Sequence, residues 1–468
     1  MMQNCKTTKP MLGALAAAAL LTGCMNLAPQ YERPPAPVAP AFPNAEAAAV
    51  RATAAADTPW QAYFTDPVLR DLIERALKNN RDLRVAVLNI DAVQAQYQLR
   101  RADQYPTVSA GLTGSRLPGS GGSTVSAYTA GLSIATYELD LFGRVRSLTD
   151  SAAAQVLASD EARKAVQISL VASVANLYLA LAADEELLEL TVRTLDTREQ
   201  SLKLTQLRFD NGTSSDLDLR LAQSVVEGAR AALALARRQR DLDRNALVLL
   251  LGEALPVPPS GPARIDGIEL SDVPAGLPSE VLLRRPDVRQ AEQQLIAANA
   301  NIGAARAAFW PRITLTGSAG TASTHLGDLF QNGAWGFSAQ LLQPIFDAGR
   351  NQANLDGAVA QRDIAVAQYE RAIQAAFRDV ADALAGRATF DEQLRAQQAQ
   401  VEAERARYGL SELRFRHGVS NSLELLDAER SLFTFEVALV QARLSQLQNR
   451  VSLYRALGGG LDAASPAS

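Results

Sequence analysis

The side chains on which most enzyme chemistry depends are scarce in this sequence. Its 468 residues include two histidines, His325 and His417, and two cysteines, Cys5 and Cys24. No phosphate-binding Gly-x-x-x-x-Gly-Lys loop is present, and no nucleophile stands at a spacing that pairs it with a base. These residue counts alone do not exclude a hydrolase that uses only carboxylates. We nevertheless expect no catalytic site, no metal site and no bound cofactor.

One motif near the N-terminus predicts a covalent modification. Lys6 and Lys9 precede a short apolar segment, residues 11–21, and this order is typical of a secretory signal peptide. The segment ends in Leu21-Thr22-Gly23-Cys24, which resembles a bacterial lipobox. We therefore expect residues 1–23 to be a lipoprotein signal peptide and Cys24 to carry covalent lipid. The alternative is an ordinary signal peptide whose removal leaves a free thiol.

The residues after the cysteine indicate a destination. Met25 stands where many inner-membrane lipoproteins carry aspartate, so we expect a lipid anchor in the outer membrane. Several acyl chains hold a protein on a bilayer where one chain would not. Residues 24–60 are rich in proline and alanine, which predicts an extended tether rather than a domain.

The mature chain is acidic and has few options for cross-linking. Removal of residues 1–23 takes two lysines and no acid from a chain of formal net charge −4, so the mature chain carries −6. Cys24 is then the only cysteine, which excludes a disulfide framework and a thiolate metal cluster. Basic residues do not cluster, so nucleic acid is not an expected partner. No later segment has about 18 uninterrupted apolar residues, so we expect no transmembrane helix in the mature chain.

Beyond the tether, the sequence repeats itself once at a spacing of 205 to 206 residues. Five short motifs recur in the same order, and their positions define a first repeat at 61–252, a linker at 253–279 and a second repeat at 280–458. The matching pairs are Asn80-Arg81-Asp82-Leu83-Arg84 with Arg285-Pro286-Asp287-Val288-Arg289, Tyr105-Pro106-Thr107-Val108 with Trp310-Pro311-Arg312-Ile313, Gly143-Arg144 with Gly349-Arg350, Leu207-Arg208-Phe209 with Leu413-Arg414-Phe415, and Leu251-Gly252 with Leu457-Gly458.

Each half predicts the order helix, two strands, long helix, turn, helix. The first helices cover about 66–103 and about 279–308, and a Tyr-Pro or Trp-Pro pair ends each of them because proline cannot continue a helix. Strands are expected within about 104–138 and about 310–346. Long helical patterns then run over about 144–251 and about 350–457, each reversed once at a glycine.

The strand segments alternate between apolar and polar residues over about ten positions, the length of a tilted membrane strand. A soluble sheet with one solvent-exposed face has the same pattern, but the lipobox favours the interpretation as membrane strands. Four strands cannot close a barrel, and an open sheet edge does not survive in lipid. Further copies of the chain must therefore complete it: two copies would supply eight strands and three would supply twelve.

These motifs together resemble the TolC-like outer-membrane factors of tripartite efflux systems, in the branch that includes NodT and OprM. The resemblance covers essentially the whole mature chain. It implies a mainly α-helical protein and a homotrimer, whose twelve-stranded membrane β-barrel continues into a long periplasmic α-barrel. The linker would form part of an equatorial region, and residues 459–468 would be a C-terminal tail. The resemblance rests on the lipobox, Tyr105-Pro106, Trp310-Pro311, Phe142-Gly143-Arg144, Asp347-Ala348-Gly349-Arg350 and the two Leu-Arg-Phe…Gly segments.

The same resemblance implies a function and partners. The chain would be a passive conduit for small molecules such as drugs and toxic compounds, in the outer membrane and the periplasm. It would dock with a periplasmic adaptor protein and with an inner-membrane pump, usually of the resistance-nodulation-division class, which supplies the energy. An outer-membrane channel for type I protein secretion and a non-conducting scaffold that spans the periplasm are the alternatives.

Candidate functional residues gather at the two glycine reversals, which we call the tips. The resemblance implies that the tips contact the adaptor and that the acids just beyond them line the periplasmic aperture. Acids at a helix start are also stabilised by the helix dipole in any protein, so a purely structural role stays open. Some relatives carry arginine where this chain has Ser420, and Arg414 and Arg416 are the candidate substitutes. The tip residues are Gly212, Thr213, Ser214, Gly418, Val419 and Ser420, and the aperture acids are Asp216, Asp218, Glu424 and Asp427.

Overall fold

Helices and strands follow one another in the order that the repeat predicts. The structure, a computed structural model, describes residues 26–42, 58–255, 264–272 and 279–461. Cys24 and the signal peptide therefore lie outside the described residues. The chain divides into two units. One holds Leu88–Asp160 and Gln290–Glu370 with the N-terminal segment to Pro35, and the other holds Ala36–Val87, Glu161–Arg289 and Arg371–Ser468.

The helix expected over 66–103 is in fact two helices, and this prediction was wrong at residue 80. α3 (Pro67–Asn79) ends and α4 (Arg81–Ala102) begins on either side of Asn80. The Asn80 side chain accepts a hydrogen bond from the Leu83 backbone and donates one to the Leu250 carbonyl, at 2.9 Å each. A short polar side chain that bonds the backbone in this way competes with helix continuation.

The second half has its break at the matching place. A 3-10 helix (Ser279–Arg284) precedes α7, which begins at Pro286 and ends at Ala307 rather than covering 279–308 without interruption. Proline is favoured in the first turn of a helix because it has no N–H to leave unpaired there. The two halves therefore share this break as well as their sequence motifs.

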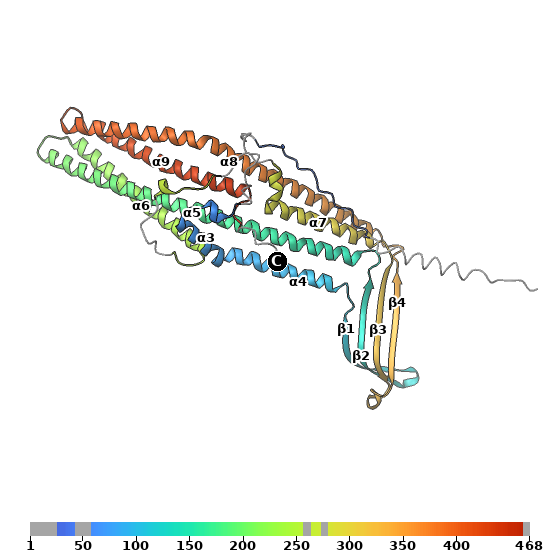
Figure 1. The fold of residues 1–468 in the computed structure, drawn as a ribbon. Coiled ribbons are helices and arrows are strands. Elements are labelled where there is room, and N and C mark those ends of the chain that lie inside the picture. The colour runs from blue at the N-terminus through green and yellow to red at the C-terminus, as the bar shows by residue number, and fades with distance from the viewer. Residues whose placement is uncertain (1–25, 43–57, 256–263, 273–278, 462–468) are drawn as a thin grey trace, which may run out of the picture. The chain divides into compact units, whose positions relative to one another are not determined.

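The four strands form one antiparallel sheet in chain order. They are β1 (Val108–Pro118), β2 (Thr124–Leu139), β3 (Arg312–Ser323) and β4 (Gly333–Leu342), and they lie side by side in Figure 1. β1 pairs with β2 and β3 with β4 as hairpins, whereas β2 and β3 come from different halves. Short 3-10 helices, Ser120–Gly122 and Leu326–Asp328, lie in the two hairpin loops.

The register gives the sheet one apolar and one polar face, as the alternation predicts. A bulge between Ile134 and Tyr137 shifts the alternation of β2 so that its apolar side chains stay on one face. The apolar face includes Val108, Leu112, Leu132, Ile134, Tyr137, Leu139, Ile313, Leu315, Trp335, Phe337 and Leu341. The polar face includes Ser109, Thr113, Thr129, Ser133, Glu138, Arg312, Thr314, Thr316, Ser318, Ser338 and Gln340.

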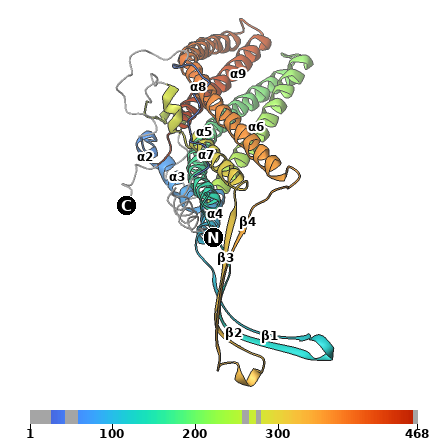
Figure 2. The same ribbon diagram turned by 90° about the vertical axis from the view of Figure 1, so that its right-hand side faces the viewer.

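A row of small residues crosses the polar face. Gly111 pairs with Gly131, Gly131 with Gly320, and Gly320 with Ala334. A Cβ atom added at Gly131 would lie 2.6 Å from the Gly320 Cα. The strands thus approach so closely here that only glycine fits on β2 and β3. Towards their loop ends the β1–β2 hairpin bends away from the β3–β4 hairpin (Figure 2), and the β2–β3 pairing begins only at Tyr128.

Two long hairpins of helices follow the strands. α5 (Arg144–Asp210) and α8 (Arg350–Arg416) have 67 residues each, which is about 100 Å at 1.5 Å per residue. α6 (Asp216–Leu251) returns along α5, and α9 (Ser422–Ala456) returns along α8. By length and composition α5 contains a segment apolar enough to cross a membrane, and 56% of that segment is buried within the chain. A packed core helix passes the same test, so this feature assigns no membrane span.

The segment after the lipobox is extended, as expected, but it packs as a strap and is not a free tether. Arg33 forms two hydrogen bonds with the Glu292 carboxylate, at 2.7 and 3.0 Å, and the Tyr31 hydroxyl donates a third at 3.0 Å. Further along α7, Asn299 donates to the Pro29 carbonyl and Arg306 to the Leu27 carbonyl. The strap therefore runs antiparallel to α7, with its earliest residues beside the end of α7 that leads into β3.

The linker between the repeats packs with the start of the first repeat and the end of the second, all within the unit that includes Arg371–Ser468. Tyr63, at the end of the short helix α2 (Trp60–Tyr63), stacks on Tyr454 of α9 with ring centroids 3.9 Å apart. The Tyr454 hydroxyl donates to the Thr58 carbonyl, and Phe64 forms a β-bridge with Leu270 of the linker. The start of the first repeat, the linker and the end of the second repeat thus share one core.

Candidate functional site

The two tips are built by the same helix-ending hydrogen bonds. Gly212 and Gly418 both have a φ of 72°, a left-handed conformation that glycine adopts without strain. The next residue in each case, Thr213 or Val419, donates its backbone N–H at 2.8 Å to the carbonyl five residues earlier. This is a Schellman motif, and it reverses the chain within a few residues. The predicted tip glycines are therefore required by backbone geometry in both halves.

Two of the candidate acids occupy matching positions at the starts of the return helices. Ser215 caps α6 and exchanges hydrogen bonds with Asp218, so that each side chain bonds the other's backbone N–H. Asn421 caps α9 and accepts from the Glu424 backbone at 3.1 Å. Asp218 and Glu424 thus stand at the third helical position, where a carboxylate is favoured by the helix dipole.

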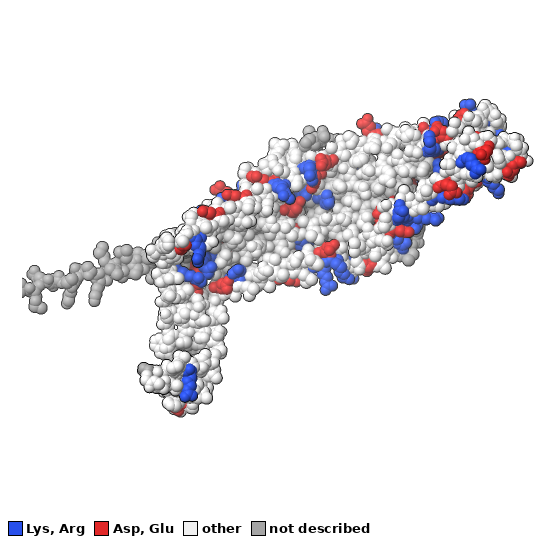
Figure 3. All heavy atoms as spheres, turned by 180° about the vertical axis from the view of Figure 1, so that it is seen from behind, with Lys and Arg blue, Asp and Glu red and all other residues white. Residues whose placement is uncertain are grey.

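Arginines lie beside three of the four acids: Glu424, Asp427 and Asp216. Glu424 is 3.5 Å from Arg414, one of the two substitutes considered for the arginine that Ser420 replaces. Arg416, the other one, binds Glu412 on its own helix. Asp427 lies 2.8 Å from Arg430 and 3.5 Å from Arg407, and Asp216 lies 3.3 Å from Arg220. Figure 3 shows charged side chains of both signs gathered over the far ends of the helical hairpins.

Asp218 also joins the two tips. The Ser422 hydroxyl donates to the Asp218 carboxylate at 2.7 Å, across 204 residues of sequence. This bond and those from Ser215 hold the pKa of Asp218 below its usual value, because they stabilise the ionised carboxylate. The Arg208 guanidinium lies 4.7 Å from the centroid of the Phe415 ring, which adds a cation–π contact between the same two turns.

A second and deeper connection lies between α5 and α9. Arg198 donates to Glu429 at 2.7 Å, and the two side chains are only 10% and 9% exposed. Burial raises the pKa of Glu429, and Arg198 opposes that rise by favouring the ionised form. Arg198 also lies 5.6 Å from the Phe433 ring centroid. The pair therefore fixes α5 of the first repeat against α9 of the second.

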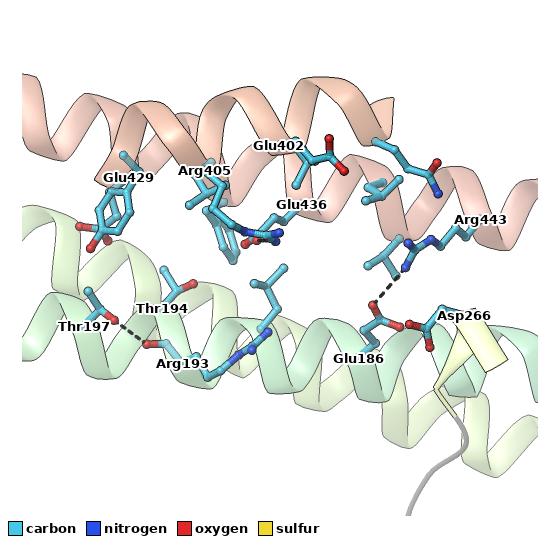
Figure 4. A pocket seen from close by; sticks show the side chains of 18 of the residues that line it. Glu186, Arg193, Thr194, Thr197, Asp266, Glu402, Arg405, Glu429, Glu436 and Arg443 are labelled. Carbon is cyan, nitrogen blue, oxygen red and sulfur yellow. Dashed lines mark hydrogen bonds and ion pairs between the residues drawn. The ribbon is translucent and has the colours of Figure 1, made fainter. Parts of the chain in front are cut away.

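A polar cleft of about 770 Å³ opens beside this pair (Figure 4). α5 contributes Glu186 and Thr194 to its wall, and α8 and α9 contribute residues such as Glu402 and Glu436. Arg443 of α9 reaches Glu186 of α5 at 3.8 Å and closes one side. Polar contacts between α5 and α9, Arg198 with Glu429 and Glu186 with Arg443, thus join the helical hairpins of the two repeats, and the cleft lies between these contacts.

The structure brings together more residues than the sequence pattern identified. Asp218 was a candidate, but its partner Ser422 and the pair Arg198–Glu429 were not. For Glu429 a signal existed: it falls on the buried stripe of α9 with Leu425 and Ala428, and an acid in an apolar stripe marks a buried partner. For Ser422 no signal existed, because its partner lies in the other repeat.

The residues with catalytic potential stay apart. His325 follows β3 in the hairpin loop and His417 lies at the second tip, as expected. Among the described residues, no three histidine, cysteine, aspartate or glutamate side chains are grouped to hold a metal ion. The two tips, and the polar contacts that join the helical hairpin of one repeat to that of the other, can carry charge. A constriction in a channel needs this property.

Comparisons with known proteins cover nearly the whole chain. The model of the family described as "Outer membrane efflux protein" matches residues 72–253 and 277–459. The toluene efflux pump outer membrane protein TtgC of Pseudomonas putida is 48% identical over 97% of this chain and 96% of its own length. Outer membrane protein OprJ of Pseudomonas aeruginosa is 45% identical over 97% of each chain. The open state of the MtrE outer membrane channel of Neisseria gonorrhoeae has a TM-score of 0.87 at 43% identity, with 94% of this chain and 99% of that one covered.

Proposed function

The chain belongs to the outer membrane efflux protein family, and we propose that it is the outer-membrane channel of a tripartite efflux pump. It works as a passive conduit, not as an enzyme, and small molecules such as drugs and toxic compounds pass through it after an inner-membrane pump has delivered them. The relative named for toluene efflux supports this cargo class over type I protein secretion.

The observation that carries this proposal is the four-stranded sheet with an apolar and a polar face. Among the described residues, β1 and β4 each pair on one side only. Exposed side chains on the apolar face include Trp335, which is 84% exposed, and Phe337, which is 66% exposed. Lipid can cover that face but cannot pair the free backbone edges. Neighbouring copies close the barrel, and the proposed assembly is a homotrimer with twelve strands.

The proposed channel function is tested with purified protein, by its oligomeric state and by its conductance in planar bilayers. A detergent-dependent, heat-sensitive trimer that opens ion-conducting pores in planar bilayers is the expected result. A water-soluble rod that forms no pores would overturn the proposal and favour a scaffold that spans the periplasm. The scaffold alternative gives no reason for the sheet's apolar face, whereas a membrane channel requires it.

The proposed lipid anchor on Cys24 is supported by the strap. Leu27, three residues after Cys24, contacts Arg306, and β3 begins six residues after Arg306. The first described part of the strap therefore lies beside the end of α7 that leads into β3. Labelled palmitate is expected to enter the wild-type protein, whereas Cys24→Ala removes the label. Retained label in Cys24→Ala would contradict the assignment. Pore formation by purified Cys24→Ala is expected to persist, because the sheet alone spans the bilayer.

The proposed partners are a periplasmic adaptor and an inner-membrane pump of the resistance-nodulation-division class. Efflux pump outer membrane proteins act with such components, and the tips are the proposed adaptor contacts. Gly212, Thr213 and Ser214 form the first contact surface, and Gly418, Val419 and Ser420 form the second. Their support is the matched geometry of the two turns, which presents two similar surfaces per protomer.

Removal of the aperture acids is expected to open the constriction. In a trimer each acid occurs three times, and a ring of carboxylates attracts cations and sets the local field. Asp218→Ala, Glu424→Ala and Asp427→Ala together remove the bond to Ser422 and the partners of Arg414 and Arg430. We expect single-channel conductance to rise about two- to fivefold and cation preference to fall, measured in planar bilayers.

A matched triple variant separates the aperture from general loss of charge. Glu227, Asp241 and Asp382 are exposed acids away from the tips, with side chains 68%, 58% and 75% exposed. Their replacement by alanine is expected to leave conductance unchanged. Equal conductance of the two triple variants would contradict a role of the tip acids in the constriction.

A further inference from the structure

The strand-lined part of the proposed channel has an unusual charge distribution. The strands contain three charged residues, Arg116, Glu138 and Arg312. By the register, Arg116 lies on the apolar face near the β1–β2 loop, while Glu138 and Arg312 lie on the polar face at the opposite ends of their strands from the loops. On the face drawn in Figure 3 the strands are almost free of charge between their ends.

Closure of the sheet turns the polar face inwards. The apolar face must contact lipid, so the other face lines the lumen of the barrel. That face carries mainly hydroxyl and glycine residues, among them Thr129, Ser133, Thr316 and Ser318. Fixed charge in the strand-lined lumen is therefore confined to Glu138 and Arg312, at the end where the strands meet the helices.

At this level the most exposed charged group of the cluster around Glu138 is Arg312. Arg144 donates to both oxygens of the Glu138 carboxylate at 2.7 Å, and Arg312 lies 2.6 Å from the same carboxylate. Glu138 is 11% exposed, whereas Arg312 is 54% exposed. Two guanidinium groups thus share one buried carboxylate, and the more exposed of the two belongs to Arg312, on the face that lines the lumen. Asp140 adds a negative charge on the Arg144 side of this cluster, where it also accepts a hydrogen bond from the Arg146 backbone at the start of α5.

We infer that Arg312 is a specificity-determining residue of the channel, which favours solutes with anionic groups such as carboxylates, sulfonates or phosphates at the entrance to the barrel. This inference rests on the proposed function, because a ring of arginines forms only when copies of the chain close the sheet. A charged ring in a narrow passage acts on every ion that crosses it.

Reversal potentials across planar bilayers in a potassium chloride gradient test the inference. Arg312→Gln is expected to shift the potassium-to-chloride permeability ratio towards potassium by about threefold or more. Arg312→Lys keeps the charge and is expected to retain the wild-type ratio. Arg116→Gln removes an arginine from the lipid-facing side and is expected to change nothing, which controls for the loss of one positive charge.

A variant that leaves the Arg312 cluster intact covers the possibility that Arg312→Gln does not assemble. Thr316 is exposed on the same face, four residues further along β3 than Arg312. Thr316→Lys is expected to shift the ratio towards chloride and Thr316→Glu towards potassium. Conducting Arg312→Gln trimers with a wild-type ratio, or Thr316 variants without opposite shifts, overturn the inference. A wild-type protein that forms no pores overturns the proposed function instead, so the two failures are distinguishable.

Discussion

Gly131→Ala and Gly320→Ala are expected to abolish assembly of the channel. A Cβ atom at Gly131 would lie 2.6 Å from the Gly320 Cα and closer still to the Ala319 carbonyl, and a Cβ at Gly320 meets the Ala130 carbonyl in the same way. The obstructing atoms are backbone, so no side chain can rotate away. Because overpacking costs about 1–3 kcal/mol where atoms can shift, a backbone clash lowers the yield of assembled trimer about tenfold or more.

These two glycines have a large effect because of their place in the sheet. They face each other on β2 and β3, which join the first repeat to the second. If these strands separate, each hairpin is left as a two-stranded ribbon, which is marginally stable by itself. The measurements are the amount of protein in the outer-membrane fraction and its migration as a trimer without heating.

Gly317→Ala is the matched control. Gly317 lies on the same strand as Gly320, and a Cβ there meets only the Gly336 carbonyl at 3.7 Å, an ordinary contact. This variant is expected to assemble as the wild type does. Assembly of Gly131→Ala and Gly320→Ala at the Gly317→Ala level would show that the strands can separate locally, and would contradict the prediction.

Arg198→Met is expected to destabilise the helical hairpins by about 3–5 kcal/mol, the cost of leaving one member of a buried ion pair alone. Glu429 is 9% exposed and would keep its carboxylate without the guanidinium that neutralises it. The effect is measured as a lower melting temperature of the helices by circular dichroism. Arg230→Met removes an exposed arginine, paired with Glu199, and is expected to cost about 1 kcal/mol or less.

The Arg198→Met defect depends on pH with a definite sign. Burial already raises the pKa of Glu429, and loss of Arg198 removes the group that opposes this rise. A carboxyl group whose folded pKa exceeds its unfolded value binds its proton more tightly when folded. The variant is therefore expected to gain stability as pH falls through that folded pKa and to lose it as pH rises. A defect of equal size from pH 4 to 8 would argue against an uncompensated Glu429.

The double variant Arg198→Met, Glu429→Leu completes the cycle. Replacement of a buried ion pair by apolar side chains of similar volume is often neutral or stabilising. We expect its melting temperature to return close to the wild-type value at every pH. A double variant as unstable as Arg198→Met would place the defect in packing instead of charge.

Local sequence patterns predicted the order of the helices and strands and the presence of an apolar face on the strands. Tyr105-Pro106 and Trp310-Pro311 ended helices because proline cannot continue one, and the alternation of apolar and polar residues predicted one apolar and one polar face for the strands. The tip glycines were identified because a chain reversal between helices needs a left-handed residue. The break at Asn80 was missed because its cause lies in a hydrogen bond to Leu250, which is distant in sequence.

The sequence by itself determined the repeat, the strand alternation, the helix ends at the proline pairs and at the tip glycines, and the lipobox motif, since each depends on neighbours within a few residues or on self-similarity. Only the tertiary structure decided which polar residues meet: Asp218 with Ser422, Arg198 with Glu429, and Arg312 with Glu138 and Arg144. Apart from Glu138 and Arg144, these partners lie about 170 to 230 residues apart. Periodicity places a side chain on a face, but a pairwise contact depends on how two faces align, and that alignment is set by packing along the whole length of both elements.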